Sequence, residues 1–259
     1  MLAKLSVDQA LIKAKSYAKK GELIEAHNIY QSILKTFSKN KRAQHGLETL
    51  NQIIRNIDPK NSRQKVVTEL LELYKSGQFF LVFNKAKVLT KQFPEAFFLW
   101  HILGVSAVQI RNLDQAIEAF KKVISINPNY ADAYNNMATA FKHKGKFDEA
   151  IEACKKALKI KPDYADAYYN LGNIFKEQGD FDKSIEAYNK SISLKPNYAE
   201  AYCNLGVVLK DKGSYDEAIC IFKKSISIRP NNALSYSNIG SILQNQGKLD
   251  EATQAYKKS

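Results

Sequence analysis

An asparagine returns in this sequence at a fixed interval, and its side-chain amide is the group with the clearest capacity for binding. The four asparagines stand 34 residues apart, at Asn136, Asn170, Asn204 and Asn238. An amide offers two N–H donors and a carbonyl acceptor, so each one can pair with the backbone of an extended peptide whatever side chains that peptide carries. Each such hydrogen bond contributes about 0.5–1.5 kcal/mol. The row therefore predicts a modest, sequence-tolerant peptide-binding site.

Further polar residues flank this row. A helix turns by about 100° per residue, so the second, sixth, ninth and thirteenth residues of the 34-residue period share one side, and Asn173 joins the row at a ninth position. Lys142, Lys176 and Lys210 border the same side and can meet acidic side chains of a ligand. A structural role is the alternative, because an asparagine copied with its repeat can also bond the neighbouring helix and set the stacking.

The sequence indicates no other chemistry. The four histidines lack metal-ligand spacing with cysteine or with each other; they are His27, His45, His101 and His143. The glycines end helices or lie inside them, and they form no phosphate-binding loop. No nucleophile and base are placed together. We therefore expect a chain without enzyme activity, cofactor or metal.

A repeated element must position the asparagines. Five prolines also stand 34 residues apart, at Pro94, Pro128, Pro162, Pro196 and Pro230, and four glycines do the same, at Gly145, Gly179, Gly213 and Gly247. A fixed period of this length is typical of stacked helical hairpins. Amphipathic helical patterns alternate along the chain with almost no strand pattern. The predicted fold class is all-α, an α-solenoid of helix-turn-helix repeats.

Each copy is predicted to contain two helices separated by a turn glycine, as in residues 165–198, where Gly179 separates them. Gly172 lies inside the first helix, where glycine costs up to about 1 kcal/mol relative to alanine, so it predicts a close approach of the two helices. Asp182 is placed to cap the second helix. The buried stripe of the first helix is predicted to be Tyr168, Leu171, Gly172 and Phe175.

The repeat register divides the chain into two predicted domains. The first, residues 1–62, holds a degenerate copy at 7–40, an extra helix at about 43–54 and a linker at 57–62. The second, residues 63–259, holds the copies 63–96, 97–130, 131–164, 165–198, 199–232 and 233–259. The last copy stops seven residues short and lacks the polar capping helix that terminal repeats usually need. We expect the full protein to continue beyond it.

The net charge of +13 arises from 39 Lys and Arg against 26 Asp and Glu. Residues 1–62 carry 11 basic and 5 acidic side chains, and the remaining excess is thinly spread. This distribution favours solvated lysines over a specific nucleic-acid site. The three cysteines have no motif spacing, which fits a reduced compartment. With no signal peptide and no apolar run of membrane length, we expect a cytoplasmic protein without membrane insertion.

An aromatic cluster near the start of the array exceeds what the repeat pattern uses. It includes Phe79, Phe80, Phe83 and Trp100. Packing against the helix at 43–54 is one interpretation. A patch for a partner or for a second copy is the other, so an oligomer remains open.

The recurring residues resemble a known family. An aromatic residue, Leu-Gly, Ala, a second aromatic and Pro follow in the order of the tetratricopeptide repeat; in residues 97–130 they are Trp100, Leu103, Gly104, Ala116, Phe120 and Pro128. The Y-x-N-L-G phrases at 168–172 and 202–206 are similar to the superhelix of O-linked N-acetylglucosamine transferases. Residues 70–98 are similar to the front end of bacterial proteins in which such an array precedes a glycosyltransferase or sulfotransferase domain.

The resemblance implies a right-handed superhelix whose first helices line a concave groove, with the asparagine row gripping an extended peptide or partner protein. The first function expected is a non-catalytic scaffold. The alternative is the N-terminal, substrate-presenting region of a larger bacterial glycosyltransferase or sulfotransferase. A third possibility is a self-assembling scaffold that uses the aromatic patch. Fold alone does not decide among them.

Overall fold

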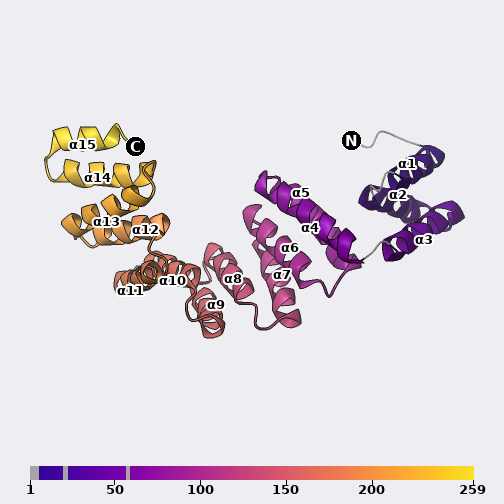
Figure 1. Ribbon diagram of the computed structural model, residues 1–259, viewed down its shortest axis with the longest axis horizontal. Coiled ribbons are helices and arrows are strands. Elements are labelled where there is room, and N and C mark those ends of the chain that lie inside the picture. Colours follow the sequence, from indigo (N-terminus) through magenta and orange to yellow (C-terminus); the bar gives the residue numbers. More distant parts are fainter. Residues whose placement is uncertain (1–5, 20–22, 57–58) are drawn as a thin grey trace. The chain divides into compact units, whose positions relative to one another are not determined.

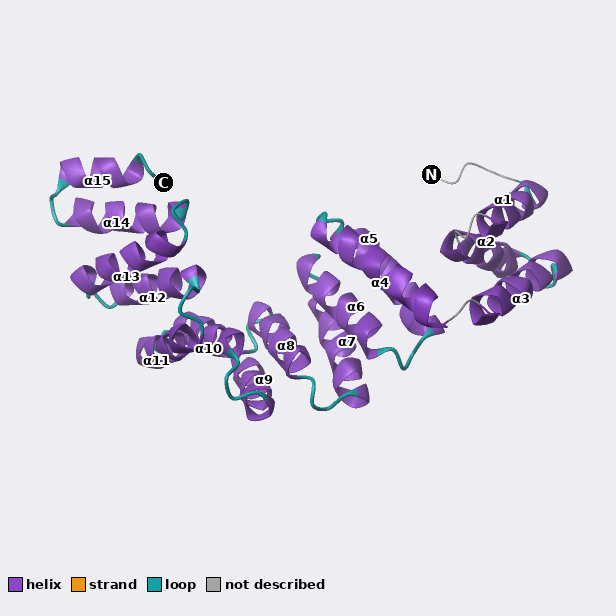
Figure 2. Ribbon diagram, viewed as in Figure 1, coloured by secondary structure: helices purple, strands orange, loops and turns teal. Residues whose placement is uncertain are grey.

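The computed structural model describes residues 6–19, 23–56 and 59–259 of the 259-residue chain. These residues form fifteen helices and no strand (Figures 1 and 2). The helices are α1 (Val7–Lys19), α2 (Leu23–Thr36), α3 (Lys41–Asn56), α4 (Pro59–Lys75), α5 (Phe79–Gln92), α6 (Phe97–Gln109), α7 (Leu113–Ile126), α8 (Ala131–His143), α9 (Phe147–Ile160), α10 (Ala165–Gln178), α11 (Phe181–Leu194), α12 (Ala199–Asp211), α13 (Tyr215–Ile228), α14 (Ala233–Asn245) and α15 (Leu249–Tyr256).

Consecutive helices pack as hairpins, and the hairpins stack. Within a copy α6 packs on α7, α8 on α9, α10 on α11, α12 on α13 and α14 on α15. Each first helix also contacts the first helix of the next copy, from α6 to α8 and onward to α14. This confirms the predicted fold class, an all-α solenoid of helix-turn-helix repeats. It also places the asparagine row on a face made by successive first helices.

The chain divides into two compact units, residues 1–72 and 73–259, and α4 crosses the division. The sequence-based boundary between 62 and 63 stays a prediction. The extra helix expected at about 43–54 is present as α3 (Lys41–Asn56). The linker expected at 57–62 is wrong from Pro59 onward, because Pro59 is the first residue of α4. Proline is well tolerated there, since the first helical residue needs no N–H bond. Residues 57 and 58 lie outside the described part of the chain.

The turn between the two helices of a hairpin requires a left-handed residue. Gly179 has φ 78° and ends α10, and its equivalents Gly77, Gly145, Gly213 and Gly247 also have positive φ. In copy 97–130 Arg111 takes this place with φ 61°. The backbone N–H of the next residue, Asn112, donates to Ala107 O at 2.9 Å. The turn geometry is therefore kept even where an arginine must adopt a strained backbone conformation.

The predicted close approach of the two helices occurs at the interior glycine. A Cβ built on Gly172 would lie 2.6 Å from the Tyr188 ring of α11. The Ser184 hydroxyl also donates to the Gly172 carbonyl oxygen at 2.8 Å. The same glycine–aromatic contact recurs in three further copies, between Gly104 and Phe120, Gly206 and Phe222, and Gly240 and Tyr256.

Copy 131–164 has a different pair at these two positions. In copy 131–164 the interior position is Ala138 and the facing position is Cys154, and both are fully buried in one cluster. A larger residue on the first helix is thus matched by a smaller one on the second, as close packing requires. Burial raises the pKa of the Cys154 thiol to about 12. Cys154 therefore acts as a small hydrophobic residue.

The predicted capping of the second helices is wrong. Asp182 is the second residue of α11, and the cap is Asp180, whose side chain accepts from the backbone N–H of Lys183 at 3.2 Å. Asp182 still lies in the first turn, where a carboxylate favours the helix dipole. Its carboxylate also forms an ion pair with Lys212 of the next copy at 2.5 Å. The helix begins two residues earlier than the capping pattern predicts.

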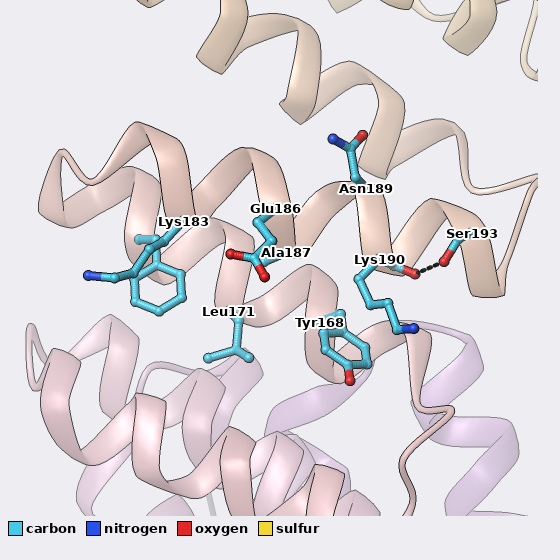
Figure 3. Close-up of a pocket in the computed structure, with 9 residues that line it drawn as sticks. Tyr168, Leu171, Lys183, Glu186, Ala187, Asn189, Lys190 and Ser193 are labelled. Atoms are coloured by element: carbon cyan, nitrogen blue, oxygen red, sulfur yellow. Dashed lines mark hydrogen bonds between the residues drawn. The ribbon is translucent and has the colours of Figure 1, made fainter.

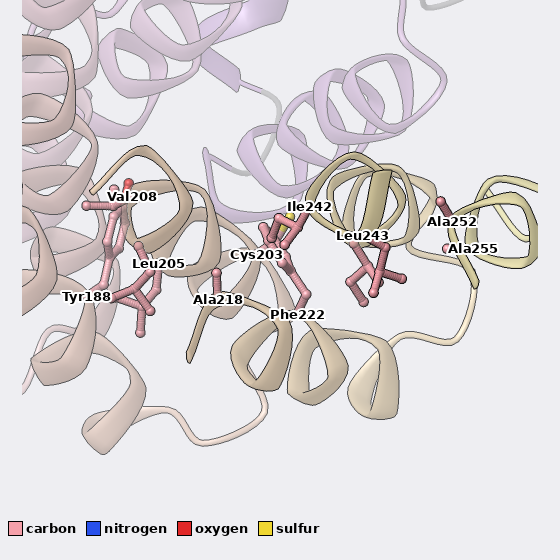
Figure 4. Close-up of a cluster of buried hydrophobic side chains, with 12 residues drawn as sticks. Tyr188, Cys203, Leu205, Val208, Ala218, Phe222, Ile242, Leu243, Ala252 and Ala255 are labelled. Carbon is pink, nitrogen blue, oxygen red and sulfur yellow. The ribbon is translucent and has the colours of Figure 1, made fainter. Parts of the chain in front are cut away.

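The core runs from copy to copy without closing. One cluster joins α11 to α15 through Tyr188, Phe222 and Ile242 (Figure 4). In the first unit α1, α2 and α3 enclose a separate core that includes Leu11, Tyr30 and Leu50. Within the described residues, no helix combines the length and apolar character needed to cross a bilayer.

The pair at Gly172 and Tyr188 can be tested by a double-mutant cycle. We expect Gly172→Ala to lower the free energy of unfolding by about 1–3 kcal/mol, because the new methyl group overpacks against the ring. Urea denaturation of the full chain measures it. Adding Tyr188→Cys, which imports the small partner used in copy 131–164, should remove most of the penalty of the Gly172→Ala change. A gain in stability from Gly172→Ala alone would show that helix propensity outweighs this contact.

Candidate functional site

The asparagine row bridges successive first helices. Asn170 of α10 donates both amide N–H groups to α8, one to Asn135 Oδ1 at 2.8 Å and one to Thr139 Oγ1 at 3.3 Å. One copy earlier, Asn136 Nδ2 lies 2.9 Å from His101 Nε2 of α6. Both asparagines are half-buried. The sixth position of one copy is thus tied to the fifth and ninth positions of the copy before it.

The next bridge extends into the hairpin. Asn204 of α12 donates to Tyr169 Oη at 3.0 Å and to Asn173 Oδ1 at 2.8 Å. Asn173 Oδ1 also accepts from Tyr188 Oη at 2.8 Å. Asn173 is therefore an acceptor inside a side-chain network that joins α10, α11 and α12. Such networks stabilise the fold when every member is paired.

The last asparagine departs from this pattern. The fifth and ninth positions of the preceding copy are Cys203 and Val207, which offer no oxygen or nitrogen acceptor. Asn238 instead donates to Leu234 O within its own helix at 2.8 Å. Its Oδ1 accepts from Lys210 Nζ at 2.6 Å. The bridge between α12 and α14 therefore depends on a long lysine side chain.

These bonds decide what the row can offer a ligand. Both N–H groups of Asn170 and of Asn204 are engaged within the protein. Within the described part of the chain, no hydrogen bond reaches the carbonyl oxygen of either side chain. The side-chain N–H groups of Asn170 and Asn204 therefore have the structural role that was the alternative to peptide binding. The acceptors of Asn170 and Asn204 are the groups that remain for a peptide N–H.

His101 must be neutral to hold Asn136. The asparagine amide nitrogen can only donate, so the His101 Nε2 accepts and the proton lies on Nδ1. Burial lowers the pKa of His101 below its ordinary value, and the nearby Asp132 carboxylate partly opposes this shift. The neutral form required by the bridge is therefore the form that the site favours near neutral pH.

The bordering lysines have different surroundings. Lys142 Nζ forms an ion pair with Glu177 of the next copy at 3.0 Å. Lys210 is held by Asn238 as described. Within the described residues, the Lys176 ammonium group has no hydrogen-bond or ion-pair partner. Of the three lysines, Lys176 is therefore the one whose charge is not already engaged.

The four residues of the predicted aromatic patch differ in exposure, and Phe79 and Trp100 are half-buried. Phe83 is buried, Phe79 packs edge-on against Tyr74 with ring centroids 5.0 Å apart, and Trp100 donates its indole N–H to Pro94 O at 2.8 Å. Phe80 is 68% exposed. The four aromatics thus do not form one open surface. Their packing against residues 43–54 stays a prediction.

A cleft of about 660 Å³ opens along α10 and α11 (Figure 3). Its apolar lining includes Tyr168, Leu171 and Phe175 of the first helix. Lys183 and Lys190 of the second helix lie at its rim. A smaller cleft of about 300 Å³ lies two copies later in the same register. The equivalent residues there are Tyr236, Ile239, Leu243, Glu251 and Lys258.

This cleft escaped sequence analysis, which assigned its lining to the core. Tyr168 and Phe175 are half-buried rather than sealed, so their apolar surfaces are reachable. Helical periodicity identifies an apolar stripe but does not show how tightly the next hairpin covers it. The sequence hints at the cleft only through the charges at its rim, which vary between copies. One copy has Lys183 there, and the copy two further on has Glu251.

Comparison with known families identifies the repeat. A model described as TPR repeat matches residues 139–179, 172–213 and 208–247. Models described as tetratricopeptide repeat match residues 119–152 and 99–130. The chain belongs to the tetratricopeptide-repeat family. The matches together span residues 99–247, so the regular part of this tetratricopeptide array includes the whole asparagine row. No curated protein gives a significant match.

Solved structures of tetratricopeptide arrays resemble the chain. The crystal structure of MamA is 33% identical, with a TM-score of 0.54, and the match covers 60% of this chain and 91% of MamA. YrrB, described as a TPR protein with an unusual peptide-binding site, is 20% identical, with a TM-score of 0.51 and coverage of 67% and 89%. The Cut9–Hcn1 assembly of the APC/C is 20% identical, with a TM-score of 0.64 and coverage of 98% and 46%. The last two show similarity of fold.

The asparagine bridges should contribute to stability. We expect Asn204→Ala to lower the free energy of unfolding by about 1–2 kcal/mol, because Asn173 and Tyr169 each lose a hydrogen-bond donor. Asn84→Ala, at an exposed position of α5, is the matched control and should be nearly neutral. Chemical denaturation compares the two variants. Equal stability would show that the bridges contribute nothing and that the row is free to face a ligand.

The His101 bridge should make stability depend on pH. The folded-state pKa of His101 is lowered, so its contribution is present above the unfolded value of about 6.5 and is lost as pH falls below it. Urea denaturation at pH 7.5 and pH 5 should show a smaller loss for His101→Gln than for the native chain, since glutamine accepts without titrating. All other residues are the same in both chains, so their contributions cancel in this difference. Identical losses would contradict the assignment.

Proposed function

We propose that the tetratricopeptide array is a non-catalytic scaffold that holds an extended segment of a partner protein against the face of its first helices. The observation that carries this proposal is the row of bridging asparagines, in which Asn170 and Asn204 keep a carbonyl oxygen without a partner among the described residues. An extended peptide in the polyproline II conformation has no internal hydrogen bonds, so its backbone N–H groups are free to donate. Acceptors set in a row on a rigid element are suited to bind them.

The spacing of the row suits an extended chain. Packed helices lie about 8–10 Å apart. An extended peptide in the polyproline II conformation rises about 3.1 Å per residue with three residues per turn, so every third N–H points the same way. One acceptor per first helix therefore meets about every third residue of a peptide that runs across the helices. Lys176 lies on the same helix as Asn170 and can pair with an acidic side chain of the peptide. Asn136, Asn238, Lys142 and Lys210 complete the proposed contact surface, with their protein-internal bonds retained.

Two likenesses support the proposal. YrrB is described as having a peptide-binding site, and the Y-x-N-L-G phrases of this array are similar to those of O-linked N-acetylglucosamine transferases. The alternative in which the array presents acceptor peptides to a glycosyltransferase or sulfotransferase domain uses the same face. The peptide contacts proposed here apply to both functions, and only the catalytic domain would distinguish them.

Backbone methylation of a bound peptide tests the proposal without changing the protein. Fluorescein-labelled peptides selected by phage display on the full chain serve as probes. We expect N-methylation at two positions about three residues apart to weaken binding by about tenfold each, because each loss of an N–H removes a hydrogen bond of about 1 kcal/mol and adds a steric clash. N-methylation at the intervening positions should have little effect.

Two protein variants show where the peptide lies. Asn170→Ala with Asn204→Ala should weaken binding, whereas Lys183→Glu with Lys190→Glu, which reverses charges at the α10–α11 cleft, should leave it unchanged. Circular dichroism confirms that each variant is folded. If methylation is tolerated everywhere and only the cleft variant loses affinity, the peptide binds at the cleft and the proposal for the asparagine face is wrong.

A further inference from the structure

A pocket of about 320 Å³ lies within the first unit, between α1 and α3. This volume is at the small end of the range of ligand sites, about 300–1,000 Å³. Tyr30 and Leu50, both buried, provide apolar lining, together with Ala18. The pocket is separate from the residues that carry the proposed function of the array.

The pocket lies beside the position from which, in the array, an asparagine bridges to the preceding first helix. If a copy is counted from Lys41, the first residue of α3, its sixth residue is Gly46. The sixth residue of α8, α10, α12 and α14 is asparagine. Arg42 is the second position and Thr49 the ninth. Glycine has no side chain to reach back to α1, so no amide joins the two first helices here. The Tyr30 ring takes the place where such a side chain would begin, and the pocket lies beside it.

A tyrosine ring forms the wall beside the glycine. In the degenerate copy 7–40 the interior position is Ala14 rather than glycine, and the aromatic at the facing position is Tyr30. The ring lies instead against Gly46 of the following helix, where a built Cβ would be 2.5 Å away. Substituting the interior glycine of the hairpin by alanine thus coincides with a shift of the aromatic contact to α3. The pocket is a consequence of these two exchanges.

Among the described residues, the charged side chains that line this pocket are basic. Lys15 and Lys19 of α1 stand on one side, and Arg42 of α3 stands on the other. Among the described residues that line the pocket, none is a carboxylate. The second position of the array is acidic in three copies, at Asp132, Asp166 and Glu200, and the corresponding residue here is Arg42. The sign of the charge is therefore reversed relative to the array.

One of these cations already binds a carboxylate. Arg42 Nη1 forms an ion pair with Asp8 Oδ1 at 2.7 Å, and the two side chains are 65% and 71% exposed. Ion pairs this exposed contribute little to stability, because water screens them. A carboxylate from a ligand can therefore replace Asp8 with little loss of stability. Two more carboxylates would find Lys15 and Lys19, which have no ion-pair partner among the described residues.

We propose that this pocket binds an acidic peptide segment, with an apolar side chain in the pocket beside the half-buried Ala18 and flanking carboxylates on Lys15, Lys19 and Arg42. Arginine and lysine form charge-assisted hydrogen bonds with carboxylates that are stronger than neutral ones. The apolar lining favours a peptide over a simple inorganic anion, which would gain nothing from that lining. The inference does not rest on the proposed function of the array.

Fluorescence polarisation of the full chain tests it, with a fluorescein-labelled peptide of alternating Glu and Leu as the probe. We expect Lys15→Gln with Lys19→Gln to weaken binding by about tenfold, the effect of losing about 1.4 kcal/mol. Lys35→Gln with Lys39→Gln, both exposed and outside the pocket, is the control with the same change in net charge and should leave binding unchanged. The Gln-for-Glu version of the peptide should bind at least tenfold more weakly.

Three outcomes would overturn the proposal. Equal losses in the two lysine pairs would show unspecific attraction to the basic unit. Displacement of the peptide by inorganic phosphate at equal concentration would show a site for simple anions. Loss of binding in Asn170→Ala with Asn204→Ala, and not in the Lys15 and Lys19 variant, would place the acidic peptide on the array instead. Circular dichroism of each variant confirms that the chain is folded.

Discussion

The contact between an interior glycine and an aromatic ring sets the geometry on which the rest of this protein depends. Gly172 lets the Tyr188 ring lie directly against the backbone of α10, which fixes how closely the two helices of the hairpin approach. The same pairing returns in three other copies, and copy 131–164 replaces both partners at once, with Ala138 facing Cys154. Both replacements are fully buried, so this hairpin stays closely packed and stacks in the same register.

Much of the fold was accessible from the sequence because its determinants are local. The 34-residue period, the turn glycines and the interior glycine predicted the hairpins, their turns and the close approach of the helices. The capping prediction failed because Asp180 and Asp182 both suit the start of α11, and the sequence alone does not say which of them precedes the first helical residue. The linker prediction failed for a related reason, since Pro59 suits the first turn of a helix as well as a loop.

The site was harder to predict from the sequence, because its hydrogen bonds depend on which side chains the adjacent copies supply. The position of the asparagine row was predicted, but the use of its donors depends on the fifth and ninth residues of another helix. Asn204 finds Tyr169 and Asn173 there, whereas Asn238 finds Cys203 and Val207. Side chains 31 or 35 residues apart become neighbours only once the hairpins stack. The α10–α11 cleft was missed because covered and open apolar stripes have the same period.

The junction between α12 and α14 has a mechanical consequence. Elsewhere the regular copies are tied by short amide side chains, and here the tie is the flexible Lys210 chain reaching Asn238. Elements joined in series deform most where the connection is most compliant. A load that bends the array therefore meets a longer and more flexible polar tie at this junction than between α10 and α12. Replacing polar residues by one cysteine and one valine thus leaves this junction to the continuous apolar core and a single lysine.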